Sequence, residues 1–428
     1  MTPFNSINEV YNFLDSVSSF RASGKKAARF DLDRFRLFCQ AIGDPQKQFP
    51  SIHVGGTNGK GSTCQILASI YQQAGYNTGL YTSPHMLHFS ERFRYNGKEI
   101  TDDELIAFFR QHSSLIKSFR LSYFEIATAI AFWWFAQKQV DLAVIEVGLG
   151  GRLDATNTIN PVASVITSVS WDHTDILGST IREIAREKAG IIKPGIPVIV
   201  GNINDEARNV IDEVADKNNS LVCGIDHLQP MYKDRKHILH YQGKHITIET
   251  GLEVPVQVYN IAVAWQVVHA LTSRFPIQQQ QITEGIAKVR EYYPSLGRFD
   301  QLVAEKQWYF DGAHNYEAVR SLKEKIETIR PVQETTLVLS LMRDKIDSKV
   351  INEFLEFKKI LYHPLNLERA AAFEEIQQWL PKANPFPANH RSREMFFKEV
   401  ESELVIFAGS LYFYSTVRDW LASSTHSR

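Results

Sequence analysis

Residues 51–63, S-I-H-V-G-G-T-N-G-K-G-S-T, carry the strongest structural signal in the sequence. The apolar run 52–54 predicts a buried strand, Gly55 and Gly56 predict a turn, and the apolar periodicity of 64–74 predicts a helix. A helix N-terminus after a glycine-rich turn binds anions, because its first backbone N–H groups lack partners within the helix and the helix dipole is positive there. The stretch therefore predicts a phosphate-binding loop.

The side chains of this loop suit a nucleotide. Lys60 supplies a positive charge for the terminal phosphates, and Ser62 or Thr63 offers a hydroxyl to Mg²⁺. Gly61 separates the lysine from the hydroxyl residue, whereas the common P-loop pattern has the two adjacent. A glycine-rich turn before an ordinary helix is the alternative interpretation.

The composition is that of a soluble globular protein, with 44% hydrophobic and 22% charged residues. A length of 428 residues favours two domains. The formal net charge of −1 provides no strong field for nucleic acid or for an anionic membrane, so we expect neither as a partner. We also expect a monomer.

Membrane and export signals are not visible in the sequence. The first ten residues lack the pattern of a signal peptide, and the longest apolar run, 126–136, is shorter than the roughly 20 residues that a membrane span needs. Cys39, Cys64 and Cys223 are scattered without metal-type spacing, which indicates reduced thiols. We therefore expect a cytoplasmic location.

Strands and helices alternate along the chain, which predicts α/β architecture with parallel, doubly wound sheets. Residues 6–20 predict a helix, 18–26 a loop, 85–97 a long loop without clear period, and 221–256 a small antiparallel β insert. A linker at 292–297 divides a domain of residues 1–296 from a smaller α/β domain of residues 297–428. The predicted strands are 52–54, 78–82, 141–147, 163–170 and 196–200, then 303–311, 335–341, 359–363 and 404–409.

Polar side chains stand at the ends of consecutive predicted strands. Ser83 follows the second strand, Glu146 lies at the end of the third, and Asp172 and His173 follow the fourth. Ligands of open α/β sheets bind beyond the carboxyl ends of the strands, and oxygen donors suit Mg²⁺. The alternatives are a simple turn at Ser83, a structural ion pair at Glu146 and a core histidine at His173.

Three further places carry candidate functional groups. Glu125 lies in the first turn of a predicted helix, where an acid also complements the helix dipole. Arg152 and Asp154 follow a glycine-rich loop, with a surface ion pair as the alternative. In the second domain, Asp311 and His314 follow a strand end and suit a ribose hydroxyl and a transferring phosphate.

Two alternatives apply in the second domain. A helix N-cap by Asn315 is the alternative interpretation of the residues around it. Arg298, at the linker, is placed to reach a phosphate between the domains. The alternative is that this single arginine binds no ligand.

Motifs along nearly the whole chain resemble the Mur ligase superfamily, and within it the branch of folylpolyglutamate synthase and dihydrofolate synthase. The matching stretches are G-T-N-G-K-G-S (56–62), T-S-P-H (82–85), E-R-F (91–93), S-Y-F-E (122–125), I-E-V-G-L-G-G-R-L-D-A-T-N (145–157), D-H (172–173), R-E-K-A-G-I-I-K (186–193), G-R-F (297–299), D-G-A-H-N (311–315), D-K (344–345) and G-S-L-Y (409–412). Residues 31–34, D-L-D-R, and Leu296 depart from the family pattern.

The resemblance implies a doubly wound P-loop ATPase domain with a Rossmann-like second domain, and an ATP-dependent ligase. Its substrates would be ATP, L-glutamate and either tetrahydrofolate or dihydropteroate, joined through an acyl phosphate. Polyglutamylation alone is the alternative within the family. A P-loop kinase or switch NTPase, and a folate-binding module without catalysis, are alternatives from other classes.

The resemblance also implies roles for individual residues. ATP contacts fall on Thr57, Asn58, Gly59, Lys60, Gly61, Ser62, Asn260, Arg298 and Asp311. Mg²⁺ ligands fall on Ser83, Glu146 and His173. Lys60, Lys188 and His314 are expected to be catalytic, and Lys188 matches a lysine that the family carries as a carbamate. Substrate contacts fall on Ser122, Tyr123, Phe124, Glu125, Arg152, Leu153 and Asp154.

Overall fold

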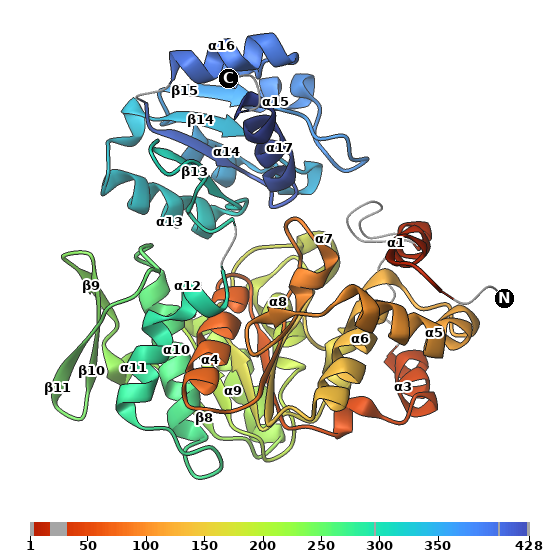
Figure 1. The fold of residues 1–428 in the computed structure, drawn as a ribbon. Helices are drawn as coiled ribbons and strands as arrows, with labels where there is room; N and C mark the ends of the chain where they lie inside the picture. Colours follow the sequence, from red (N-terminus) through yellow and green to blue (C-terminus); the bar gives the residue numbers. More distant parts are fainter. Residues whose placement is uncertain (1–3, 18–31, 295–296, 401–402, 426–428) are drawn as a thin grey trace. The chain divides into compact units, whose positions relative to one another are not determined.

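The computed structural model describes residues 4–17, 32–294, 297–400 and 403–425. The chain forms two compact units, Met1–Pro294 and Ser295–Arg428 (Figure 1). The predicted α/β class with largely parallel sheets is confirmed in both. The predicted loop 18–26 and the departures from the family pattern at 31 and 296 lie outside the described residues.

A mostly parallel sheet forms the centre of the first unit. Its strands are β1 (Ser51–Gly55), β2 (Thr78–Tyr81), β3 (Phe93–Tyr95), β4 (Lys98–Glu99), β5 (Leu142–Glu146), β6 (Ala163–Ile166), β7 (Val198–Val200) and β8 (Val222–Gly224). Among the described residues this eight-stranded sheet has the order β4-β3-β2-β5-β1-β6-β7-β8. From β2 to β8 the neighbours are parallel, and β3 and β4 add an antiparallel edge.

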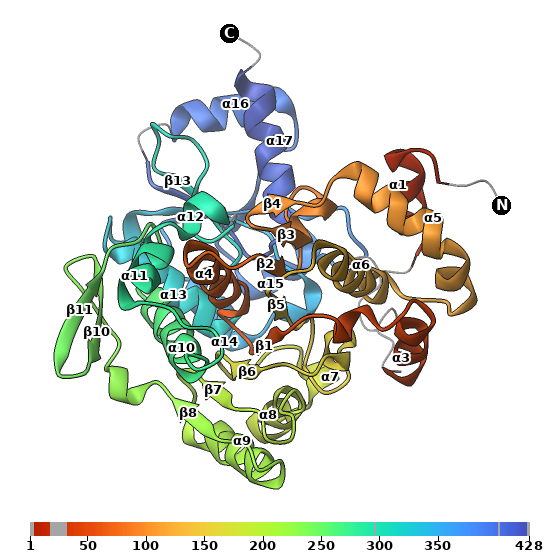
Figure 2. The same ribbon diagram turned by 60° about the horizontal axis from the view of Figure 1, so that its bottom comes forward.

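Helices cover both faces of this sheet, because successive side chains of a strand point to opposite sides. The helices are α1 (Ile7–Ser16), α3 (Leu32–Ala41), α4 (Lys60–Gln73), α5 (Asp102–Ser118), α6 (Tyr123–Lys138), α7 (Thr174–Leu177), α8 (Ile181–Ala189), α9 (Asp205–Lys217), α10 (Gln257–Ala270), α11 (Gln279–Ala287) and α12 (Val289–Tyr292). Ile52 and Val54 of β1 pack with α4 and α10, whereas Ala143 and Ile145 of β5 pack with α6 (Figure 2). Burial on both faces explains the continuous apolar runs of these strands.

Helix α4 begins at Lys60, four residues before the predicted start at Cys64. Gly59 precedes it in the left-handed region, at φ +84°, and a Cβ there would collide with the side chain of Asn260. Glycine at position 59 permits the chain to turn sharply there, so that the helix can begin at the next residue. As a result, Lys60 is the first helical residue.

Three segments of the first unit differ from the prediction. The predicted strand 163–170 ends at Ile166, because residues 167–170 leave the sheet and bond to the 56–62 loop instead. The predicted loop 85–97 contains a 3₁₀ turn at Phe89–Arg92 and strand β3. Helix α9 was not predicted, although its N-cap Asn204, whose side chain accepts from Ala207 N at 2.8 Å, was a visible signal.

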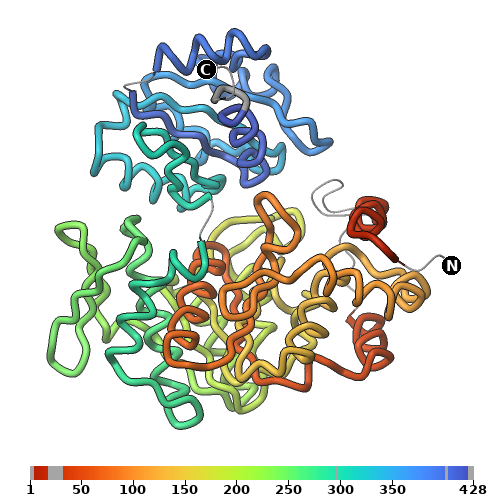
Figure 3. Tube along the Cα trace, viewed as in Figure 1, coloured from red at the N-terminus to blue at the C-terminus, as the bar shows by residue number. Residues whose placement is uncertain are grey.

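The predicted β insert is confirmed in large part. Strands β9 (Met231–Lys233), β10 (Lys236–Tyr241) and β11 (Lys244–Ile248) form an antiparallel sheet of their own in the described residues (Figure 1). Figure 3 shows the course of the chain through this insert in green. The first predicted part of the insert, β8, instead joins the main sheet beside β7. None of the described helices combines the length and the apolar character needed to cross a bilayer.

The second unit has its own sheet of six strands among the described residues, in the order β12-β13-β17-β14-β15-β16. The strands are β12 (Asp300–Gln301), β13 (Trp308–Asp311), β14 (Thr336–Leu339), β15 (Lys359–Tyr362), β16 (Ala383–Pro385) and β17 (Val405–Ala408). The helices are α13 (Tyr316–Glu327), α14 (Ser348–Phe354), α15 (Phe373–Trp379), α16 (His390–Glu399) and α17 (Phe413–Thr425). Strand β16 and helix α16 were not predicted, and the predicted strand 303–311 begins only at Trp308.

Candidate functional site

The 56–62 loop is held in place by the segment that follows β6. Thr57 N donates to Ser168 O at 2.8 Å, and Asn58 N donates to Ser168 Oγ at 2.8 Å. The Thr57 hydroxyl donates to Ser170 O at 3.2 Å and accepts from Ser170 N at 3.1 Å. These bonds fix the loop from which α4 begins, and with it the direction of the first N–H groups of the helix. The polar run T-S-V-S at 167–170 was the available sequence signal for this support.

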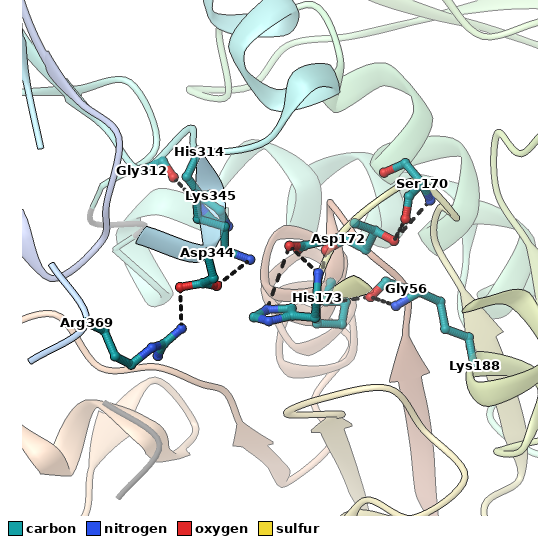
Figure 4. A network of polar contacts seen from close by, with 12 residues as sticks. Gly56, Ser170, Asp172, His173, Lys188, Gly312, His314, Asp344, Lys345 and Arg369 are labelled. Carbon is teal, nitrogen blue, oxygen red and sulfur yellow. Dashed lines mark hydrogen bonds and ion pairs between the residues drawn. The ribbon is translucent and has the colours of Figure 1, made fainter. Parts of the chain in front are cut away.

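Two lysines meet at one carbonyl of the loop. Lys60 Nζ donates to Gly56 O and to Thr57 O, each at 3.1 Å, and Lys188 Nζ donates to Gly56 O at 3.0 Å (Figure 4). Lys188 is only 3% exposed. Burial, and next the charge of Lys60, lower the pKa of Lys188 to about 7, and Asp172 opposes the shift. Lys188 is therefore a neutral amine in a large fraction of molecules at neutral pH.

Ser83 and Glu146 are brought together at neighbouring strand ends, as the sequence predicted. Ser83 N donates to Glu146 Oε2 at 2.9 Å, and the carboxylate is buried. A Cβ added to Gly61 would stand 3.7 Å from both oxygens of Glu146. The carboxylate thus lies directly beside the first turn of α4.

His173 is oriented by the residue before it. It precedes α7 with a positive φ of 48°, and its backbone N–H donates to Asp172 Oδ1 at 2.9 Å. The same oxygen lies 3.8 Å from His173 Nε2 (Figure 4). Asp172 therefore fixes the unusual backbone conformation of His173 and stands beside its ring.

Asn260 reaches the 56–62 loop from α10, together with Gln257, which the sequence analysis missed. Gln257 Nε2 donates to Ser62 Oγ at 3.3 Å, and Asn260 Nδ2 donates to Gln257 Oε1 at 2.9 Å. The Thr63 hydroxyl donates to Asn260 Oδ1 at 3.5 Å. The signal for Gln257 was its position three residues before Asn260, on the same helix face.

The N-terminus of α6 is closed by a capping box. Ser122 N donates to Glu125 Oε2 at 2.7 Å, and Arg34 Nη2 donates to Glu125 Oε1 at 2.6 Å. Glu125 thus lies in the first turn, where an acid complements the helix dipole, and it also forms a capping box and an ion pair that the sequence analysis did not indicate. Tyr123 packs against Phe89, with ring centroids 5.6 Å apart, and is half-buried.

The glycine-bearing loop after β5 lies against α6. A Cβ added to Gly148 would collide with the ring of Phe124. Arg152 Nη2 contacts Glu187 Oε1 at 2.8 Å and is 53% exposed, so the alternative of a surface pair with Asp154 is wrong in its partner. Leu153 is half-buried and Asp154 is buried. The structure therefore gathers the predicted substrate residues at two adjoining segments of the first unit.

In the second unit, Asp311 ends β13 and its carboxylate is held by the backbone. Asp311 Oδ2 accepts from Phe299 N at 2.8 Å and Oδ1 accepts from Ala313 N at 2.9 Å. Burial raises the pKa of Asp311 to about 6, and the charge of Arg298 opposes this shift. His314 Nδ1 donates to Gly312 O at 2.7 Å (Figure 4).

Two further observations complete the second unit. Asn315 caps α13, its side chain accepting from Ala318 N at 3.0 Å, as the alternative interpretation predicted. Asp344 bonds Arg369 at 2.8 Å and lies 3.5 Å from Lys345 (Figure 4). Arg369 was not singled out in the sequence, because no motif surrounds it.

Comparison with known proteins gives a consistent family. The model of the Mur ligase middle domain matches residues 54–268. Folylpolyglutamate synthase of Lacticaseibacillus casei is 32% identical, covering 96% of this chain and 99% of that protein. Dihydrofolate synthase/folylpolyglutamate synthase of Bacillus subtilis (strain 168) is also 32% identical, covering 95% of this chain and 98% of that protein.

Solved structures agree with these relatives. The structure of E. coli FolC in complex with DHPP and ADP has a TM-score of 0.84 and 29% identity, covering 99% of this chain and 100% of that one. A bifunctional folylpolyglutamate synthase/dihydrofolate synthase with Mn, AMPPNP and L-glutamate bound has a TM-score of 0.83 and 27% identity, covering 99% of each chain.

Proposed function

This chain belongs to the folylpolyglutamate synthase/dihydrofolate synthase family of Mur ligases, and we propose that it joins L-glutamate to folates with ATP as the energy source. The observation that carries the proposal is the 56–62 loop. Lys60 and Lys188 both donate to the carbonyl of Gly56 in this loop. The carboxylate of Glu146 lies beside helix α4, which begins at the end of the loop. This arrangement suits the neutralisation and orientation of a terminal phosphate.

The proposed reaction has two steps. A carboxylate oxygen of the folate attacks the γ-phosphorus of ATP, which forms an acyl phosphate and releases ADP. The amine of L-glutamate then attacks the acyl carbon, the amide bond forms, inorganic phosphate leaves and the amine loses a proton. Lys60 and the first-turn N–H groups of α4 would orient the γ-phosphate and offset its charge.

The residues beyond the strand ends fit Mg²⁺. Mg²⁺ takes one or two carboxylates together with substrate phosphates and waters, and Glu146 beside Gly61 offers such a carboxylate next to the phosphate position. In the described part of the chain, no three histidine, cysteine, aspartate or glutamate side chains gather into a metal cage. We assign Ser83, Glu146 and His173 as its protein ligands. When bound, the ion would neutralise charge on the phosphates.

Glu146→Gln and His173→Ala are each expected to raise the Mg²⁺ concentration for half-maximal rate by about tenfold or more, because each removes a ligand. The measurement is a Mg²⁺ titration of ATP turnover. Glu213→Gln is the matched control, since its carboxylate pairs only with surface arginines, Arg182 and Arg186, in the described contacts. An unchanged Mg²⁺ titration for either variant would mean that the residue is not a Mg²⁺ ligand and has a structural role.

The remaining assignments rest on the family likeness. We propose that the first unit is a P-loop ATPase domain and that the second is Rossmann-like. Thr57, Asn58, Gly59, Gly61, Ser62 and Asn260, with Arg298 and Asp311 of the second unit, are proposed ATP contacts. His314 is proposed to act near the transferred phosphate. A monomeric state and a cytoplasmic location stay predictions.

We propose that both acceptors are used, dihydropteroate as well as reduced folates. Relatives named for both activities support this proposal. Tyr123 and Phe124 also offer flat apolar surface for a pteridine ring, and the loop that contains Arg152, Leu153 and Asp154 lies against Phe124 at Gly148. With ATP, Mg²⁺, L-glutamate and dihydropteroate, we expect dihydrofolate, ADP and phosphate in equal amounts. The amounts of dihydrofolate and ADP are measured by chromatography of the products.

The other outcomes separate the alternatives. Extension of tetrahydrofolate without any dihydrofolate would mean that the enzyme only polyglutamylates. ATP hydrolysis that ignores L-glutamate would indicate a switch NTPase. Folate binding without ADP formation would indicate a binding module.

A further inference from the structure

The loop that follows β5 is closed on itself by a buried carboxylate. Asp154 Oδ2 accepts from Leu149 N at 2.8 Å, near the start of the loop. Asp154 Oδ1 accepts from Thr156 N at 3.0 Å and from the Thr156 hydroxyl at 2.6 Å, at its end. The side chain is buried. Both carboxylate oxygens of Asp154 therefore accept hydrogen bonds from within the protein, and these bonds hold residues 149–154 as one closed turn.

The hydrogen bonds behind Asp154 have a defined direction. The Thr156 hydroxyl has one proton, and it is donated to Asp154, because an ionised carboxylate only accepts. Thr156 Oγ1 must then accept from His53 Nε2, 2.8 Å away. His53 is fully buried, and burial lowers its pKa to about 3, so the ring is neutral with its proton on Nε2. Its Nδ1 is buried without a hydrogen-bond partner among the described residues.

This chain of bonds joins two parts of the candidate site. His53 lies on β1, directly before the 56–62 loop, and pairs in register with Ile145 of β5. Asp154 lies at the far end of the loop that follows β5, and that loop packs on Phe124 through Gly148. The relay from His53 through Thr156 to Asp154 thus ties the loop to the central strand of the sheet.

We propose that His53 and Thr156 are positioning residues for the folate substrate, which they hold indirectly by fixing the loop 149–154 through Asp154. The inference rests on the proposed function and refines it. Asp154 acts through the shape of the loop, and the contacts to the substrate come from the loop backbone, from Arg152 and Leu153, and from Phe124. A buried relay of this kind preorganises a site, because its members are held by one another inside the protein.

Thr156→Val is the decisive variant, because valine has nearly the same shape but neither accepts from His53 nor donates to Asp154. We expect the KM for dihydropteroate or tetrahydrofolate to rise roughly tenfold, as for the loss of a hydrogen bond to a charged group, while the KM for ATP stays within about twofold. Thr156→Ser, which keeps the hydroxyl, should restore the folate KM. Thr158→Val is the matched control, because the Thr158 hydroxyl donates to Ala155 O in the same turn and does not belong to the relay.

His53 is tested in the same way. His53→Gln places an amide N–H near the position of Nε2 and should keep the folate KM close to that of the wild type, whereas His53→Leu should raise it as Thr156→Val does. Because both residues act in one relay, the double variant should be no worse than the more affected single variant. Thermal unfolding of each variant checks the fold. If Thr156→Val does not fold, the comparison is made between Thr156→Ala and Thr156→Ser.

Several results would overturn the inference. Equal shifts in the KM for ATP and for folate, equal effects of Thr156→Val and Thr158→Val, or additive effects in the double variant would each mean general destabilisation instead of positioning. An unchanged folate KM in Thr156→Val would also overturn it. These failures differ from a failure of the proposed function, in which the wild-type protein itself would form no amide from either acceptor.

Discussion

Lys60→Ala is expected to lower turnover at saturating ATP by about 10²–10³-fold, the usual effect of removing one preorganised charge contact from a transition state. Lys60 is the first residue of α4, and its amine is anchored on the carbonyls of Gly56 and Thr57. The charge is therefore in place before the nucleotide binds, and no reorganisation is needed during phosphoryl transfer. ADP release, followed with saturating folate and L-glutamate, measures the effect.

The control for Lys60 is Lys47→Ala, since Lys47 forms only an exposed ion pair with Asp44, at 2.8 Å, in the described contacts. Lys60→Arg should also be poor, because a planar guanidinium cannot occupy the position of an ammonium on two carbonyls. Near-normal turnover of Lys60→Ala at saturating ATP would refute the assignment of the 56–62 loop.

Lys188→Ala is expected to be inactive, and short carboxylic acids are expected to restore part of its activity. A buried amine whose pKa is lowered to about 7 is neutral in about half of the molecules near pH 7, and a neutral amine can attack CO₂. The nitrogen then gains a carboxylate and loses a proton, so that a cation becomes an anion, able to stand beside Mg²⁺. Acetate or formate in the cavity left by the side chain would replace that charge.

The pH dependence of this step has a definite sign. Because the pKa of Lys188 is lowered, the fraction of neutral amine increases as the pH rises through about 7. An ordinary lysine reaches the same fraction only at a pH of about 10.4. At a fixed concentration of dissolved CO₂, activation of CO₂-depleted enzyme should therefore become faster between about pH 6 and 8. Mass spectrometry under CO₂ provides a second check.

Lys193→Ala is the matched control for Lys188. Burial also lowers the pKa of Lys193, to about 8, but its amine bonds Asn157, with Nζ to Oδ1 at 2.7 Å, instead of Gly56. Short acids should not activate that variant. Full activity of Lys188→Ala without added acid would exclude the carbamate.

Local pattern explains where prediction from the sequence succeeded. The strand, turn and helix at 51–63 follow from an apolar run, glycines and an apolar period, all within a few residues of one another. Ser83 and Glu146 could be expected to meet because strands of a parallel sheet end at the same edge, and their 2.9 Å contact agrees. The prediction failed where segments are short, as in β16, or where residues leave a sheet for a tertiary partner, as 167–170 do.

The sequence by itself determined the α/β class, the position of the 56–62 loop and the polar residues at the strand ends, because each depends on neighbours along the chain or on a period. Only the tertiary structure decided which groups these residues bond. Lys188 and Gly56 are 132 residues apart, Arg34 and Glu125 are 91 apart, and His53 and Thr156 are 103 apart. Contacts of this kind arise when helices and loops pack on a common sheet, and the spacing of residues along the chain contains no measure of that packing. The lowered pKa of Lys188 has the same origin, since it comes from burial and from the nearby charge of Lys60.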